Sequence, residues 1–187
     1  MTTAVLLPVK GFSGAKARLS PVLGPQARAD LARDLAERVV AAARPLPITV
    51  VTSDRDVMGW ADMLGLDVTI DPGGGLSAAV TSGVAALARR GVDQLIVAHG
   101  DLPMADDLSW LARFGGITLV PDRREDGTNV ICLPTTSGFT FSYGPDSFGR
   151  HRHEARRLGL PLRIVRDPSL GWDIDFPADL EPVTLPV

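Results

Sequence analysis

Three aspartates have the chemistry and the spacing of a metal site. Asp173 and Asp175 are one residue apart, so their carboxylates point to the same side of an extended backbone. Like charges held that close repel each other unless a cation lies between them. Asp101 follows a predicted strand, and Mg²⁺ typically binds one or two carboxylates together with phosphate oxygens. We therefore predict that Asp101, Asp173 and Asp175 bind one or two Mg²⁺ ions.

A simpler explanation is available for each of these aspartates. A lone aspartate after a strand most often caps the segment that follows it, and Asp101 precedes one. Either Asp173 or Asp175 could cap a helix that begins near Pro177, with the other carboxylate in solvent. The two explanations differ in what the carboxylates contact, namely a cation or backbone N–H groups.

A basic, glycine-containing loop follows the first predicted strand. Lys10, Lys16 and Arg18 lie within nine residues, together with Gly11 and Gly14. Backbone N–H groups of such a loop can surround phosphates while lysine and arginine neutralise their charge. The P-loop pattern G-x-x-x-x-G-K-[ST] is absent, so this is a different kind of phosphate loop. The alternative is a solvated surface loop.

A second glycine-rich loop, residues 73–75, follows the third predicted strand and precedes a helix. Glycines there let a ligand approach the main chain closely, and a planar base could be read by backbone groups. Gly75, Leu76 and Ser77 are the candidate contacts. A flexible connection is the alternative.

Further along the chain, hydroxyl and amide groups gather near the start of a predicted helix. Thr128 and Asn129 form one pair, and Gly144 and Ser147 form the other. Helix N-termini bind anions well, although turn chemistry favours the same residue types. His151 has no partners that would complete an acylation triad, and Cys132 is expected to be a small core residue.

Alternating apolar runs and helix-period segments predict the scaffold for these residues. Strands are expected at 4–9, 48–52, 66–70, 94–98, 117–120, 130–133, 139–141 and 162–165, and helices at 28–43, 54–64, 77–90, 104–114 and 147–158. This alternation predicts an α/β fold with a mostly parallel sheet, helices on both faces and a mixed edge. In such a sheet, ligands bind beyond the carboxyl ends of the strands, where the residues above would meet.

Composition limits the class of protein. The 187 residues carry a net charge of −3, with 45% hydrophobic and 22% charged residues, as expected for one folded domain over 1–187. The charge argues against nucleic acid as a partner, and the single cysteine excludes an internal disulfide. Apolar runs of about half a dozen residues are far shorter than the ~20 needed to cross a bilayer. With no targeting segment visible, the expected location is the cytoplasm.

Taken together, these motifs resemble the CofC/FbiD guanylyltransferases of coenzyme F420 biosynthesis, a nucleotidyltransferase group with a GT-A-like, Rossmann-like fold. The resemblance covers essentially the whole chain, from Pro8 to Leu180. It is carried by A-K-A-R-L (15–19), G-L-S (75–77), G-D-L-P (100–103), G-T-N (127–129) and Y-G-P-D-S-F (143–148) with His151. The chain departs from the expected pattern at His99 and at Ser77.

The resemblance implies a reaction and a set of roles. GTP would donate a guanylyl group to 2-phospho-L-lactate, phosphoenolpyruvate or 3-phospho-D-glycerate, and pyrophosphate would leave. Asp101, Asp173 and Asp175 would hold Mg²⁺ and act in catalysis with Lys16. The GTP contacts would be Lys10, Lys16, Arg18, Gly75, Leu76 and Ser77, and the acceptor contacts would be Thr128, Asn129, Gly144 and Ser147.

Two other functions are compatible with the same fold. A molybdopterin nucleotidyltransferase would carry a G-G-x-S-x-R-M-G loop after the first strand, which this chain lacks. A non-catalytic nucleotide-sensing domain would not need three aspartates at strand ends. The identity of the acceptor acid stays open, and so does a homodimer.

Overall fold

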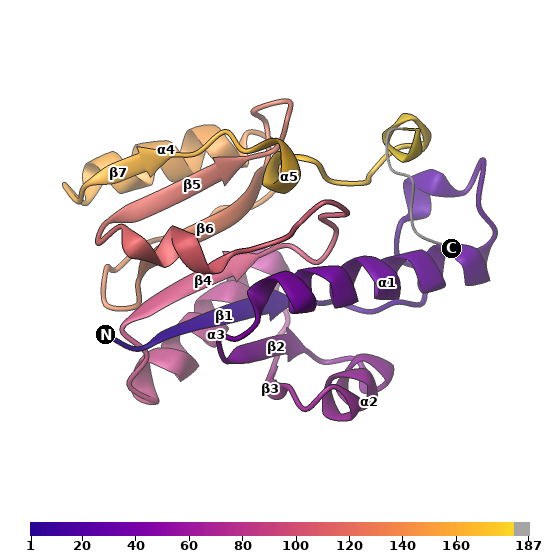
Figure 1. The fold of residues 1–187 in the computed structure, drawn as a ribbon, viewed down its shortest axis with the longest axis horizontal. Coiled ribbons are helices and arrows are strands. Elements are labelled where there is room, and N and C mark those ends of the chain that lie inside the picture. The colour runs from indigo at the N-terminus through magenta and orange to yellow at the C-terminus, as the bar shows by residue number, and fades with distance from the viewer. Residues whose placement is uncertain (182–187) are drawn as a thin grey trace.

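The computed structural model of the protein describes residues 1–181 and is built around one seven-stranded sheet (Figure 1). The strands are β1 Thr3–Pro8, β2 Ile48–Thr52, β3 Asp67–Ile70, β4 Gln94–Ala98, β5 Ile117–Pro121, β6 Thr128–Pro134 and β7 Leu162–Ile164. The α-helices are α1 Pro25–Ala43, α2 Arg55–Met63, α3 Leu76–Arg89, α4 Ser147–Arg157 and α5 Pro168–Gly171. Short 3-10 helices are η1 Ala17–Leu19, η2 Ser109–Arg113 and η3 Pro177–Leu180.

The strand order is β3-β2-β1-β4-β6-β5-β7. Strands β3, β2, β1 and β4 pair in parallel, as the alternating pattern predicted. Strand β6 runs antiparallel to both β4 and β5, whereas β5 and β7 are parallel. The sheet is therefore mixed toward one edge, as predicted, although the antiparallel strand β6 lies inside the sheet and the edge strand β7 is parallel to β5.

Helices cover both faces of this sheet because its strands are apolar on both sides. One core packs α1, α2, η2 and α5 against alternate residues of the central strands, including Val5, Leu7 and Ile96. The other core packs α3 and α4 against the intervening residues, including Leu6 and Val97. Figure 1 shows α1 in front of the sheet and α3 and α4 behind it. No helix within residues 1–181 is both long and apolar enough to cross a membrane.

The predicted strand at 139–141 is wrong. Phe139 and Phe141 are buried in the second core, as their alternation indicated, but the segment joins no sheet. Its backbone instead bonds to α4 side chains, because the N–H of Thr140 donates to Glu154 and that of Ser142 to His151. A helix thus supplies the hydrogen-bond acceptors that a neighbouring strand would otherwise supply.

The predicted helix at 104–114 is largely absent as well, since only η2 forms there. Aspartate side chains compete with the helix for backbone groups: Asp106 accepts the N–H of Asp107, and Asp107 accepts that of Ser109. Helix α1, by contrast, begins three residues before its predicted start, with Pro25 in its first turn.

Candidate active site at the carboxyl edge of the sheet

Asp101, Asp173 and Asp175 meet at the carboxyl edge of the sheet. Asp101 follows β4, and the other two follow α5, yet one carboxylate oxygen from each lies within 4.8 Å of the others. Ile174, between the paired aspartates, is fully buried in a small core with Leu19 of η1. This apolar anchor joins the segment after α5 to the loop after β1.

The carboxylates do not act as helix caps in residues 1–181. No N–H of a following helical turn donates to any of the three, and the N–H of Phe176, which caps η3, donates to Asp179 instead. One oxygen of Asp101 and one of Asp173, both named Oδ1, are buried without a hydrogen-bond partner among the described groups. Buried polar atoms ordinarily have partners, so these oxygens point to a ligand.

Two cations of the loop after β1 face the carboxylates. The Nζ atom of Lys16 lies 2.7 Å from Oδ2 of Asp101 and 3.5 Å from Oδ1 of Asp175. A guanidinium nitrogen of Arg18 lies 2.9 Å from Oδ2 of Asp175. Lys16 has a left-handed backbone, with φ of 53°, which is rare for a residue with a side chain. Such outliers cluster at functional sites.

Burial and mutual charge shift the pKa values of these groups. Burial by itself would lower the pKa of Lys16 and raise that of Asp101. Their mutual attraction outweighs burial, so the pKa of Lys16 is raised and that of Asp101 is lowered. Asp173 has no cationic partner of this kind within residues 1–181, so burial, Asp101 and Asp175 raise its pKa to about 6. The site therefore carries more negative charge than its own lysine neutralises.

A cavity of about 700 Å³ opens beside the carboxylates, lined by loop residues 10–11 and 13–18 together with Asp54 and Asp175. Lys10, Lys16 and Arg18 all line it, as the sequence predicted they would share a site. A Cβ at Gly11 would come 2.9 Å from Oδ2 of Asp54, so a larger residue there would force the Asp54 carboxylate to move. This cavity has the charge and size to take polyphosphate.

A second cavity of about 520 Å³ shares Lys10, Gly11 and Lys16 with the first. Its wall includes the glycine loop 73–75 and Leu76, and its floor includes Gly100 and Asp101. Gly75 has φ of 89°, in the region that favours glycine. The cavity is more apolar than the first, as a nucleobase pocket would be.

The structure does not bring Ser77 to this cavity. Its hydroxyl accepts the N–H of Tyr143 over 2.9 Å, so it ties the start of α3 to the segment before α4. The expected direct contact between Ser77 and the nucleotide is therefore not supported, whereas Gly75 and Leu76 do line the cavity.

The residues expected at the acceptor converge in part. Thr128 begins β6 and Ser147 begins α4; both are almost fully buried, and their hydroxyl oxygens are 3.5 Å apart. Gly144 precedes the helix with φ of 109°, and its carbonyl accepts the N–H of Ser147. Asn129 differs, because its amide donates to the carbonyl of Leu170 and so holds α5. The Asn129 side chain thus has a structural role, and its contact with the acceptor stays a prediction.

His151 fixes the hydrogen-bonding direction at Thr128. The N–H of Ser142 donates to Nε2 of His151, so in the neutral ring the proton is on Nδ1, which lies 3.0 Å from the hydroxyl oxygen of Thr128. Burial lowers the pKa of His151 to about 4, with a smaller contribution from Arg150. Thr128 therefore accepts from the imidazole and has its own hydrogen free to donate elsewhere.

Aromatic rings connect this hydroxyl pair to the carboxylates. The Tyr143 ring lies 4.9 Å from that of His151 and 5.2 Å from that of His99, measured between centroids. His99, two residues before Asp101, lines the second cavity. Packed rings therefore link the histidine that contacts Thr128 to His99, two residues before Asp101.

The residues that support the paired aspartates were not among those predicted from the sequence. Asp179 is fully buried and bonds to the segment that carries them, and Arg123 and Arg124 reach it from the loop between β5 and β6. A signal was present: an aspartate two positions after Pro177 fits the third position of a helical turn, where carboxylates bond back to the cap.

Comparison with known proteins agrees with this geometry. A relative named phosphoenolpyruvate guanylyltransferase, from Sphaerobacter thermophilus, is 38% identical over 97% of this chain and 92% of its own length. A protein of the same name from Rubrobacter xylanophilus is 34% identical over 96% of this chain and 92% of its own length.

Solved structures share the fold at low identity. A nucleotidyl transferase from a Methanothermobacter species has a TM-score of 0.67 at 19% identity, covering 97% of this chain and 95% of its own. A protein from Desulfovibrio desulfuricans G20, provisionally described as a nucleotide-diphospho-sugar transferase, has a TM-score of 0.79 at 19% identity, covering 96% and 85%. The family described as "Guanylyl transferase CofC like" matches residues 3–186, and the chain therefore belongs to that family.

Proposed function

We propose that this protein transfers the guanylyl group of GTP to the phosphate of a small phosphorylated three-carbon acid and releases pyrophosphate. One observation carries the proposal: a cationic cavity and a more apolar cavity share Lys16, which directly contacts the carboxylate of Asp101. Such an arrangement can bind the phosphates of a nucleotide in the first cavity, its base in the second, and a metal ion at the carboxylates beside them. Membership of the family supports guanylyl transfer in particular.

Phosphoenolpyruvate is the acceptor we favour, because the relatives quoted above are named for it. The alternatives are 2-phospho-L-lactate and 3-phospho-D-glycerate, which differ from it by small groups on the three-carbon chain. We place the product, a guanosine-diphospho-acid, in coenzyme F420 biosynthesis on the strength of the family resemblance. A cytoplasmic location and a homodimer stay predictions.

The three carboxylates fit Mg²⁺. All their facing atoms are oxygens, the donor type that this ion prefers, and two buried oxygens have no partner within residues 1–181. Asp101, Asp173 and Asp175 would hold the ion. When bound, Mg²⁺ would supply positive charge to the nucleotide phosphates and to the leaving pyrophosphate.

The chain's own residues bind and orient GTP. Lys10, Lys16 and Arg18 line the cationic cavity and would neutralise the triphosphate. The loop 73–75 borders the neighbouring cavity and would contact the nucleoside through its backbone. Lys16, which reaches both cavities and the carboxylates, is placed to contact the phosphates nearest the reacting phosphorus.

The acceptor needs no general base. Its phosphate is mostly dianionic at pH 7, because the second pKa of a phosphate monoester is about 6. A phosphate oxygen attacks the α-phosphorus of GTP, a new P–O bond forms, and the bond to the β-phosphate oxygen breaks with its electron pair leaving on pyrophosphate. The hydroxyl of Thr128, whose hydrogen is free, would donate to the acceptor and hold it in line, and that of Ser147, 3.5 Å away, would donate to Thr128 or to the acceptor.

The reaction with a panel of acceptors tests the proposal. The purified protein is incubated with GTP, Mg²⁺ and each of the three acids in turn, and the product is identified by mass while pyrophosphate is measured. We expect a guanylylated acid and one pyrophosphate per turnover, with phosphoenolpyruvate fastest. Absence of product with all three acids would overturn the proposal, and guanylylation of molybdopterin instead would favour the rival nucleotidyltransferase.

A further inference from the structure

Asp179 holds the backbone of the segment that carries Asp173 and Asp175. Its carboxylate is fully buried, and Oδ2 accepts the N–H groups of Asp175 and Phe176, both over 2.8 Å. The indole N–H of Trp172 donates to the backbone carbonyl of Asp179 over 3.2 Å. The two ends of the segment are therefore bound to the same residue.

The other oxygen of Asp179 faces two guanidinium groups. Arg123 and Arg124 both pair with Oδ1, the latter at 3.0 Å. Arg123 also contacts the carbonyl of Asp173 at 3.5 Å and lies over the Trp172 ring, 3.9 Å from its centroid. The loop between β5 and β6 thus binds the segment 172–179, which carries Asp173 and Asp175, mainly through Asp179.

These contacts leave Asp179 unsuited to be a fourth metal ligand. Both of its oxygens are occupied by N–H donors, whereas Asp101 and Asp173 each keep a buried oxygen without a partner in residues 1–181. Its charge is neutralised by the two arginines, so it adds little repulsion to the neighbouring carboxylates. What Asp179 controls is the direction of the peptide groups next to the Asp175 side chain.

We propose that Asp179 is a positioning residue, which sets the spacing of the Asp173 and Asp175 carboxylates for a divalent cation by fixing the backbone N–H groups of Asp175 and Phe176. Arg123 and Arg124 hold it in place. The inference rests on the proposed function, because it takes those two carboxylates as metal ligands. Groups that orient metal ligands typically change metal affinity by 10- to 100-fold when they are removed.

The test measures Mn²⁺ binding by calorimetry without nucleotide, on the full chain and on Asp179→Asn and Asp179→Ala. Alanine removes both acceptor oxygens, and asparagine keeps the size but turns one of them into a donor that faces N–H groups or guanidinium. We expect the dissociation constant for Mn²⁺ to rise at least about tenfold in both variants. The Mg²⁺ concentration for half-maximal activity should rise equally, and saturating Mg²⁺ should restore most of kcat with KM for GTP unchanged.

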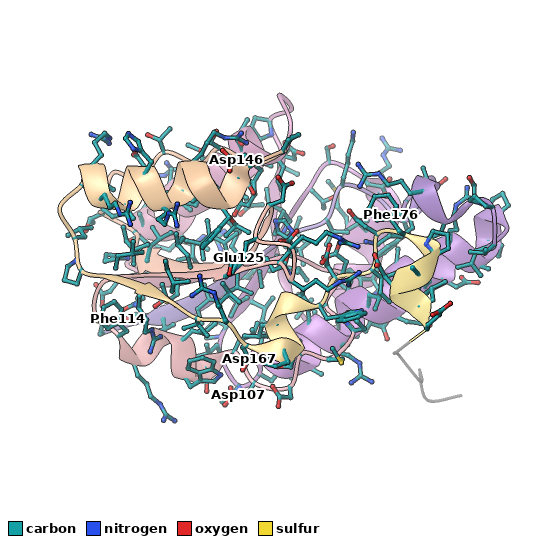
Figure 2. The ribbon with its side chains drawn as sticks, turned by 90° about the horizontal axis from the view of Figure 1, so that it is seen from above. Asp107, Phe114, Glu125, Asp146, Asp167 and Phe176 are labelled. Atoms are coloured by element: carbon teal, nitrogen blue, oxygen red, sulfur yellow. The ribbon has the colours of Figure 1, made fainter. Side chains whose placement is uncertain are left out.

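Asp167 provides a matched control. Its carboxylate accepts the N–H groups of Ser169 and Leu170 at the start of α5, as Asp179 does for Asp175 and Phe176, but it contacts neither aspartate. Figure 2 labels Asp167 and Phe176 at separate places on the C-terminal segment. Asp167→Asn should bind Mn²⁺ like the unmodified protein, so a loss confined to the Asp179 variants supports the inference.

The results separate this inference from the function on which it rests. If the unmodified protein binds Mn²⁺ and folded Asp179→Ala binds it equally well, the positioning role is overturned while the metal site stands. Equal losses in Asp167→Asn and Asp179→Asn would also overturn it, since any cap would then do the same. A folded, unmodified protein that binds no Mn²⁺ would overturn the metal site and this inference together. Should the alanine variant not fold, Asp179→Asn decides.

Discussion

The Nζ atom of Lys16 lies 2.7 Å from a carboxylate oxygen of Asp101, inside the cluster proposed to hold a divalent cation. Its side chain is only 11% exposed, so the attraction is poorly screened by water. Lys16 therefore has two proposed functions: it pairs with the carboxylates of the protein, and it binds the phosphates of the nucleotide.

Replacing Lys16 should change these two functions in opposite directions. In Lys16→Met, Mn²⁺ binding without nucleotide should tighten several-fold, because no lysine competes for Asp101. The kcat/KM for GTP should fall about 10- to 100-fold, the usual effect of losing a charged hydrogen bond. Calorimetry and steady-state kinetics measure the two effects. Unchanged values in both would remove the proposed role of Lys16.

Asp173→Asn should separate activity from stability. Burial and the neighbouring carboxylates raise the pKa of Asp173 to about 6, so the ionised side chain destabilises the metal-free fold at pH 7. The amide has no charge, and we expect the free energy of unfolding to rise by about 1–3 kcal/mol without metal. Turnover should fall about 1000-fold, or about 4 kcal/mol in the barrier. Thermal melting in a chelator and kcat in Mg²⁺ are the measurements.

An unchanged kcat in Asp173→Asn would remove this carboxylate from the metal site. A lower melting temperature in chelator would contradict the electrostatic argument by itself. The exposed Asp106, whose carboxylate accepts the neighbouring Asp107 N–H, offers the control substitution Asp106→Asn, with neither effect expected.

The parts of this site that could be predicted from sequence depend only on residues that are close together in the chain. An apolar run ending in Asp101 gives a strand with a carboxylate at its end, and the i, i+2 spacing of Asp173 and Asp175 places two carboxylates together. Both features appear in the structure, and Lys10, Lys16 and Arg18 share one cavity as expected.

The parts that sequence could not predict depend on contacts between distant residues. Ser77 has the right position for a nucleotide loop, but its hydroxyl accepts the N–H of Tyr143, which lies 66 positions later in the sequence. Similarly, the side-chain amide of Asn129 donates a hydrogen bond to the carbonyl of Leu170. The alternation of Phe139 and Phe141 correctly indicates burial, yet whether their backbone pairs with a strand or with α4 side chains depends on tertiary packing.

The buried His151 should make stability depend on pH below neutrality. Its pKa is about 4 in the folded protein, mainly because of burial, and 6.5 is the ordinary value expected on unfolding. Between these values the unfolded chain binds more protons at this histidine, so the contribution of His151 to stability falls as pH drops from 6.5 through about 4. The contribution lost is about 3 kcal/mol.

Comparison with His151→Phe isolates this contribution. The phenyl ring keeps the packing with Phe139 and Tyr143 but has no proton to gain. The variant should be less stable at pH 7.5, because Ser142 loses its acceptor, and the difference from the unmodified protein should shrink toward pH 4. His99, whose pKa burial also lowers, contributes the same trend to both proteins and cancels. Denaturant unfolding at several pH values gives the difference, and a gap that stays constant would contradict the assignment.

Removing the hydroxyl of Thr128 or Ser147 should weaken binding of the acceptor and leave binding of GTP unchanged. Because His151 donates to Thr128, the threonine hydrogen is free to donate to an anion, and the Ser147 hydroxyl lies 3.5 Å away at the start of α4. Thr128→Val keeps the shape of the side chain and removes the donor. We expect KM for the acceptor to rise about 10- to 100-fold, as for loss of a hydrogen bond to a charged group, with KM for GTP unchanged.

Ser147→Ala should have an effect of the same kind, and the double variant shows whether the two hydroxyls bind one group. If both donate to the same carboxylate or phosphate of the acceptor, their effects on kcat/KM should not multiply, because neighbouring donors to one anion are coupled. Thr140→Val, at an exposed position before α4, is the control for general loss of a hydroxyl. Equal rises in KM for GTP and for the acceptor would place these hydroxyls at the nucleotide and contradict the proposed division of the site.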